Sequence, residues 1–171
     1  MKKSINHYQI GRAGYEKDKK RMFAEKINSM KQMKDRNIEF QVFKEGGPDY
    51  EVKKDGNVIA YFEAEFPLEG RWPSGEDFKF KTIRWPKRKY ENYKKLEGFY
   101  NGKPLFMITI RCDLTDCYYI DARTWLQKGK LERVWDSVFY GIDKNDPDLG
   151  HGLQGLVDYM LDRIKKIYGE V

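Results

Sequence analysis

Three acidic residues stand close together in the segment 45–66, EGGPDYEVKKDGNVIAYFEAEF: Asp49, Glu63 and Glu65. Glu63 and Glu65 are two residues apart on a predicted strand, so both side chains point to one face, about 7 Å apart at the backbone. Carboxylates gathered on one face repel one another unless a cation neutralises them, and their hard oxygens suit Mg²⁺ or Mn²⁺. Such an ion activates water and stabilises negative charge on a phosphate.

The position of Asp49 depends on the register of the predicted hairpin. A three-residue loop, 55–57, places Asp49 opposite Glu63, whereas a two-residue turn, 55–56, places it opposite Phe62 on the other face. A shift of one residue reverses the face of every side chain. The alternative to a metal site is an ordinary solvated hairpin, but aromatic residues around Glu63 and Glu65 favour a sheltered position, where an unpaired acid would be costly.

The hydrophobic pattern predicts an α/β fold in which a mixed sheet is flanked by an N-terminal and a C-terminal helix. Helices are predicted at 14–34, 87–96, 122–128 and 149–167. Strands are predicted at 37–43, 50–53, 58–66, 105–111 and 118–121, with an extended piece at 78–85. The segment 133–142 has no clear pattern.

Length and charge restrict the class of protein. The 171 residues are enough for one domain with a core, and the net charge is +6. No apolar run reaches membrane-spanning length, and the first residues lack the apolar core of a signal peptide, so we expect a cytoplasmic protein that does not enter a membrane. Basic residues are concentrated in 1–36 and in 79–95, which favours a polyanionic partner.

The order of these motifs resembles the PD-(D/E)xK nuclease superfamily, which includes restriction enzymes and Holliday-junction resolvases. The matching segments are Gly14-Tyr15-Glu16 at the start of the first helix, Pro48-Asp49 before the hairpin, Glu63-Ala64-Glu65 in the place of Glu-x-Lys, and the basic piece Pro86-Lys87-Arg88-Lys89. The resemblance spans about residues 11–66, and the later strands are consistent with it. It implies a restriction endonuclease-like fold over a single nuclease-like domain, residues 1–171.

The main departure from the family pattern is Glu65, which stands where the family usually has lysine. The family lysine orients or helps to ionise the attacking water, a role that a carboxylate does not fill as a cation. Glu65 would instead act as a general base or hold the water through the metal. Lys87 and Lys89 are the candidates for a lysine supplied from elsewhere.

The resemblance therefore implies a Mg²⁺- or Mn²⁺-dependent DNA endonuclease, similar to phage-encoded members and acting as a homodimer. The implied catalytic residues are Asp49, Glu63 and Glu65, with Glu16 as a further metal ligand. The implied DNA contacts are Lys79, Lys81, Arg84, Lys87, Arg88 and Lys89. Two alternatives remain open: a catalytically inactive nuclease-fold module that binds nucleic acid, and a protein-interaction module whose acidic hairpin is coincidental.

Overall fold

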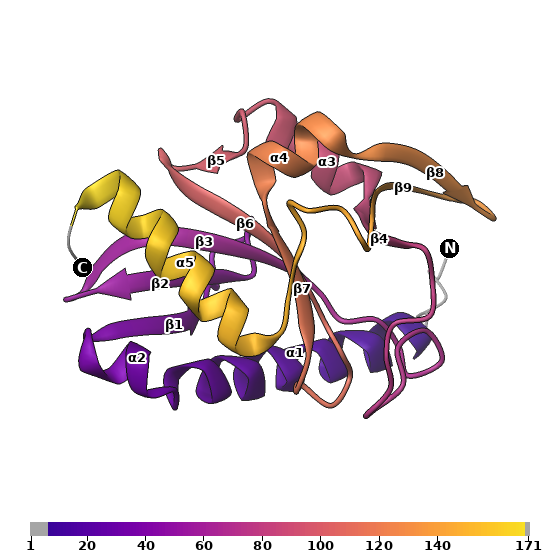
Figure 1. The fold of residues 1–171 in the computed structure, drawn as a ribbon. Helices are drawn as coiled ribbons and strands as arrows, with labels where there is room; N and C mark the ends of the chain where they lie inside the picture. The colour runs from indigo at the N-terminus through magenta and orange to yellow at the C-terminus, as the bar shows by residue number, and fades with distance from the viewer. Residues whose placement is uncertain (1–6, 170–171) are drawn as a thin grey trace, which may run out of the picture.

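The computed structural model describes residues 7–169, with side chains from residue 15 onward, and it contains a mixed sheet between two layers (Figure 1). The sheet runs in the order β1-β2-β3-β6-β7-β10. These strands are β1 (Ile38–Val42), β2 (Tyr50–Lys54), β3 (Asn57–Glu65), β6 (Lys103–Ile110), β7 (Cys117–Asp121) and β10 (Gly150–His151). Only β3 and β6 pair in parallel along this path, and a short β5 (Phe99–Tyr100) pairs with the start of β6. The predicted mixed α/β class is confirmed.

Helices α1 (His7–Asn28) and α5 (Leu153–Tyr168) pack on one face of this sheet (Figure 1). Phe23 and Ile27 of α1 join Val157 and Ile164 of α5 in one buried cluster with Ala60, Phe62 and Ala64 of β3. The prediction of a single helix over 14–34 is wrong at both ends. The helix begins at residue 7 and ends at residue 28, and a separate short helix, α2 (Lys31–Asp35), follows.

The opposite face is covered by α3 (Lys87–Lys94), α4 (Ala122–Lys128) and a second, three-stranded sheet. That sheet has the order β4-β9-β8, from β4 (Thr82–Pro86), β8 (Lys130–Val134) and β9 (Ser137–Asp143). Two tryptophans join it to the main sheet and to α4: Trp85 donates to the Ile108 carbonyl at 3.1 Å, and Trp125 donates to the Tyr140 carbonyl at 3.1 Å. The segment without a clear pattern is therefore the greater part of the β8–β9 hairpin.

A β-bulge sets the register of the acidic hairpin. Lys54 pairs with Asn57, so of the two alternatives the turn is the two-residue one, Asp55 and Gly56, both with positive φ. The register then shifts between Lys53 and Val52, so that Tyr50 pairs with Phe62. Without the extra residue of the bulge, this turn would place Asp49 opposite Phe62. With it, the register continues to Asp49 opposite Glu63.

Within residues 7–169, no helix combines the length and apolar character that crossing a membrane requires.

The loop before Asp49 depends on Gly47. Its φ is +105°, and a Cβ built there would lie 2.7 Å from the Tyr100 hydroxyl oxygen. We expect Gly47→Ala to lower the free energy of unfolding by about 1–3 kcal/mol, because the residue adds both backbone strain and a steric clash. Urea denaturation measures this. Gly46→Ala is the matched control, since Gly46 also has a positive φ but a Cβ built on it would meet no atom within 4 Å. Equal losses in the two variants would exclude the contact with Tyr100 as a constraint.

Candidate active site

The centre of the site is the ammonium group of Lys89, which lies between the two glutamates of β3. Lys89 Nζ is 2.6 Å from Glu63 Oε1 and 2.8 Å from Glu65 Oε1, and it donates to the Ala64 carbonyl at 3.1 Å. The Lys89 side chain is 12% exposed and that of Glu63 is 5% exposed. Lys89 lies in the first turn of α3, which begins directly after Pro86 ends β4. The chain order β4-Pro86-α3 therefore brings a lysine back over the acidic end of β3.

Asp49 completes the cluster from the neighbouring strand end. Its Oδ2 accepts a hydrogen bond from the Ala64 amide at 2.8 Å, and its Oδ1 forms an ion pair with Lys20 of α1. Tyr93 of α3 donates its hydroxyl hydrogen to Glu63 Oε2. Both carboxylates are thus held by named donors, and the two oxygens of Glu63 contact different residues of α3.

Burial and charge separate the pKa values of the two facing acids. The pKa of Glu63 is raised to about 7: burial is the largest cause, the charge of Lys89 opposes it, and the charge of Asp49 adds to it. Burial also works to raise the pKa of Asp49, but the charges of Lys89 and Lys20 and a hydrogen bond from Glu63 outweigh it, so this pKa is lowered. Asp49 is therefore ionised at neutral pH while Glu63 titrates there, the division of roles expected when like charges face each other.

Lys89 stays cationic in this setting. Burial alone would lower its pKa, but the charges of Glu65, Glu63 and Asp49 exceed that effect and raise it. Removing an ammonium from such a place would leave buried carboxylates without a counter-charge, which is costly.

The cluster opens onto a cavity of about 780 Å³. Glu16 of α1 lines it together with the three predicted acids, so the structure brings all four predicted metal ligands to one cavity. Lys87 and Arg88 line it as well, beside the residues 137–139 of β9.

The remaining predicted DNA contacts lie elsewhere. Arg84 lines a second cavity. Lys79 is exposed and pairs with Glu76 at 3.1 Å, and the exposed Lys81 lines neither cavity.

The acids fit a divalent ion as a pair rather than as a triad. Among the described residues, no group of three or more His, Cys, Asp or Glu side chains is arranged to hold a metal ion. Glu63 and Glu65 both form ion pairs with Lys89, whereas Asp49 pairs with Lys20 and lies within hydrogen-bonding reach of Glu63. Mg²⁺ is commonly held by one or two carboxylates, with water and substrate phosphate completing its shell, so the pair of Asp49 and Glu63 suits it.

Two contributors to the site are not predicted from the sequence, Lys20 and Tyr93. Each stands four residues after a predicted or candidate site residue, Glu16 in α1 and Lys89 in α3 respectively. Residues four apart lie on the same side of a helix, so this spacing is the signal that could have found them.

Comparisons of the chain with models of protein families, with characterised proteins and with solved structures gave no match. The function is therefore inferred from the site itself.

Titration of Glu63 predicts how stability depends on pH. Because its folded-state pKa lies above the ordinary value of 4.5, its contribution is fully present below about pH 4.5 and is lost as pH rises through about 7. The loss is on the order of 3 kcal/mol for this shift. We expect Glu63→Gln to flatten the fall in unfolding free energy between pH 4.5 and pH 8, measured by urea denaturation.

Glu39→Gln is the control for this prediction, because Glu39 is an exposed glutamate on β1. It should keep the pH dependence of the wild type. An unchanged slope in Glu63→Gln would show that Glu63 does not titrate in this range.

Proposed function

We propose that this protein is a metal-dependent DNA endonuclease with a restriction endonuclease-like fold, in which Asp49 and Glu63 hold Mg²⁺ or Mn²⁺. The observation that carries the proposal is the placement of a lysine ammonium beside this acid pair, inside a cavity open to a large substrate. An ionised acid, a second acid that titrates near neutrality and a fixed cation are groups that phosphodiester hydrolysis can use.

Lys89 supplies the cation that the nuclease pattern usually places two residues after the glutamate. In this chain that position is Glu65, and its carboxylate lies 2.8 Å from Lys89 Nζ. Glu65 is then a positioning residue that holds Lys89 over the acid pair, rather than the general base that the sequence suggested. The ammonium comes from α3 instead of β3, and this exchange accounts for the departure from Glu-x-Lys.

The ion held by Asp49 and Glu63 would activate a water molecule and offset the charge that develops on the phosphate. Lys89 is placed to stabilise negative charge beside Glu63, because its ammonium is fixed there by three acceptors. These acceptors occupy all three of its N–H donors, so Lys89 would orient the water only by releasing one of them. Tyr93 holds the outer oxygen of Glu63. Lys20 fixes Asp49 from the helix on the opposite side of the hairpin.

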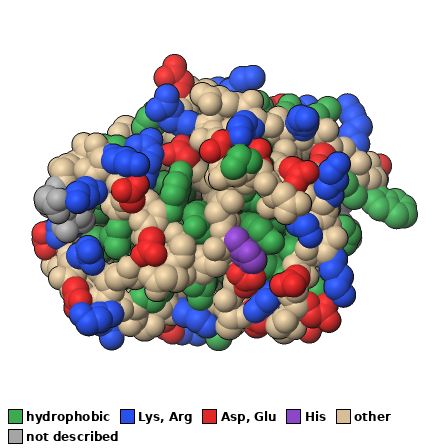
Figure 2. Space-filling model, in the orientation of Figure 1, with side chains coloured by type: hydrophobic (Ala, Val, Ile, Leu, Met, Phe, Trp, Pro, Cys, Tyr) green, Lys and Arg blue, Asp and Glu red, His purple; other side chains and the backbone are tan. Residues whose placement is uncertain are grey.

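The surroundings of the cavity suit a nucleic acid strand. The exposed Lys87 and Arg88 at its wall offer charge to phosphates. Trp135 stands 98% exposed at the tip of the β8–β9 hairpin, whose strand β9 lines the same cavity, and an isolated aromatic ring is a platform for stacking on a base. On the face drawn in Figure 2, the basic side chains of the described residues are interspersed with acidic ones. Lys87, Arg88 and the nearby Trp135 make the wall of the cavity the proposed place for the strand.

The test is cleavage of supercoiled plasmid with Mg²⁺, with Mn²⁺ and with EDTA. The wild type should nick the plasmid only with a divalent ion, and Asp49→Asn should abolish nicking. Lys89→Ala should slow it by about 10²-fold or more, the usual loss when a donor that stabilises developing negative charge is removed. The double variant Glu65→Lys/Lys89→Ala should recover part of the lost rate, because it returns an ammonium to the same place from β3.

Lys87→Ala is the matched control, since it removes the same charge from the same turn of α3 outside the cluster. It should cleave at the wild-type maximal rate once DNA is saturating. Equal losses in Lys87→Ala and Lys89→Ala would remove the special role of Lys89. A wild type that cuts no DNA with either ion, yet binds DNA in a salt-dependent manner, would instead identify a nuclease-fold module that only binds.

A further inference from the structure

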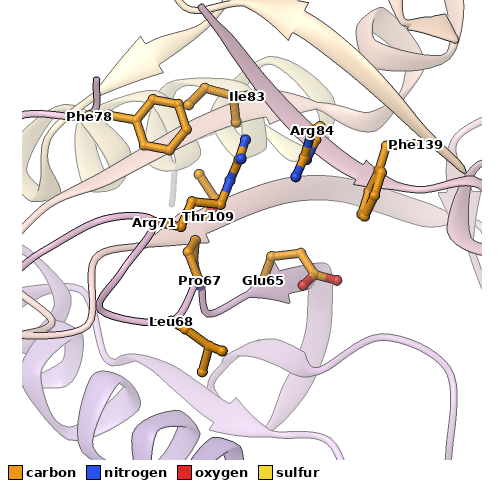
Figure 3. A pocket seen from close by; sticks show the side chains of 9 residues that line it. All are labelled: Glu65, Pro67, Leu68, Arg71, Phe78, Ile83, Arg84, Thr109 and Phe139. Atoms are coloured by element: carbon orange, nitrogen blue, oxygen red, sulfur yellow. The ribbon is translucent and has the colours of Figure 1, made fainter. Parts of the chain in front are cut away.

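A second, smaller cavity lies on the other side of Glu65 (Figure 3). Its volume is about 210 Å³, and it shares Glu65 and Phe139 with the larger cavity of the acid cluster. Arg71, from the loop after β3, and Arg84 of β4 both reach into it, and Figure 3 shows their side chains above Glu65. Two cations thus line a hollow next to the candidate active site.

Aromatic rings hold both guanidinium groups. The Cζ atom of Arg71 lies 4.4 Å from the centre of the Phe80 ring and 5.3 Å from that of Phe78. The Cζ atom of Arg84 lies 4.3 Å from the centre of the Phe139 ring. Stacking of this kind uses the flat face of a guanidinium and leaves the N–H groups along its edge available.

Those edges have no protein acceptor within the described part of the chain. Neither Arg71 nor Arg84 forms a salt bridge or a side-chain hydrogen bond with another described residue. Glu132 acts on both through its charge without forming an ion pair. Burial and the neighbouring charge of Arg84 lower the pKa of Arg71 to about 10, so both groups are still cationic at neutral pH. No buried side-chain nitrogen or oxygen of the described residues lacks a partner, so these N–H edges face the solvent of the cavity, where two adjacent cations can meet an anion.

We propose that Arg71 and Arg84 bind a phosphate group of the nucleic acid strand, next to the phosphate that the acid cluster cleaves. The cavity is smaller than the 300–1,000 Å³ typical of a site for a whole small-molecule ligand, so it suits one group of a larger substrate. Guanidinium edges match phosphate oxygens in bidentate geometry. The two cavities meet at Glu65, so a strand that lies in one can place a phosphate in the other. This inference rests on the proposed function for the identity of the strand.

The phosphate can be an internal phosphodiester or a terminal phosphate monoester. Both present the same oxygens to the arginines. The two sources are separated by the form of the DNA, since a covalently closed circle has no terminal phosphate.

The first experiment uses inorganic phosphate as the probe, in EDTA, so that it does not depend on cleavage. The melting temperature of the wild type should rise with phosphate more than with sodium chloride at equal ionic strength, because a ligand that binds only the folded state stabilises it. Arg71→Ala and Arg84→Ala should each lose this difference in melting temperature. Arg84→Lys keeps the positive charge but lacks the paired N–H donors of a guanidinium, so it should retain part of the difference. Arg133→Ala is the control, because Arg133 is exposed on β8 and lines neither cavity. A shift that is equal in Arg84→Ala and Arg133→Ala would overturn the proposal.

The second experiment measures DNA affinity in EDTA for three forms: duplexes with phosphorylated ends, the same duplexes with hydroxyl ends, and a closed circle. Arg84→Ala should weaken binding of at least one form by about tenfold relative to Arg133→Ala, the equivalent of one lost charged hydrogen bond. A loss confined to phosphorylated ends identifies a terminal phosphate, and a loss that includes the circle identifies an internal one. Unchanged affinity for all three forms would overturn the site. A wild type that binds as predicted but cleaves nothing would contradict the nuclease proposal and leave this site standing.

Discussion

The burial of Glu63 is the constraint on which the rest of the site depends. Its side chain is 5% exposed on an inner strand, where an isolated charge would be costly. The ammonium of Lys89 and the hydroxyl of Tyr93, both from α3, offset this cost by contacting the Glu63 carboxylate. Helix α3 is in turn held by aromatic packing: the Tyr90 ring stacks on Tyr140 at a centroid distance of 3.6 Å and meets Trp125 edge-on at 5.4 Å. The second sheet and α4 therefore serve the acid cluster by fixing the helix that neutralises it.

The β2–β3 hairpin brings the second acid, Asp49, to Glu63. A two-residue turn alone would turn Asp49 away from Glu63, and the bulge reverses that outcome. Gly47 lets the preceding loop pass close to Tyr100, and Lys20 of α1 then holds Asp49 in place. The acid pair is thus assembled by a bulge, a glycine and a helix.

Local signals in the sequence are enough for much of this fold. The strand of Glu63 and Glu65 follows a strong turn signal, and the buried strand β6 is a nearly continuous apolar run. Both strands, and the helix at 122–128, lie close to their predicted places. The β8–β9 hairpin carries no such pattern, because half-buried and exposed positions on β9 do not alternate cleanly. The bulge between β2 and β3 could not be predicted from the local sequence. The other edge of β3 pairs with β6, and this long-range pairing constrains the register of β3 as well as the turn does.

The site shows the same limit. In the sequence, Lys87 and Lys89 are equal candidates for a compensating lysine, because both belong to one basic run. The structure separates them, since Lys87 pairs with Glu91 at the surface whereas Lys89 points to the acids. Arg71 has no signal of its own, because only the folded chain brings it and Arg84 to the same cavity.

Binding of Mn²⁺, followed by electron paramagnetic resonance, tests most directly whether Asp49 and Glu63 form a metal centre. The wild type should bind Mn²⁺ at one site, and both Asp49→Asn and Glu63→Gln should lose it. Asp55→Asn makes the same chemical change at the far end of the same hairpin, in the exposed turn, and should bind as the wild type does. Equal binding in Asp49→Asn and Asp55→Asn, or no Mn²⁺ binding by the wild type, would contradict this account.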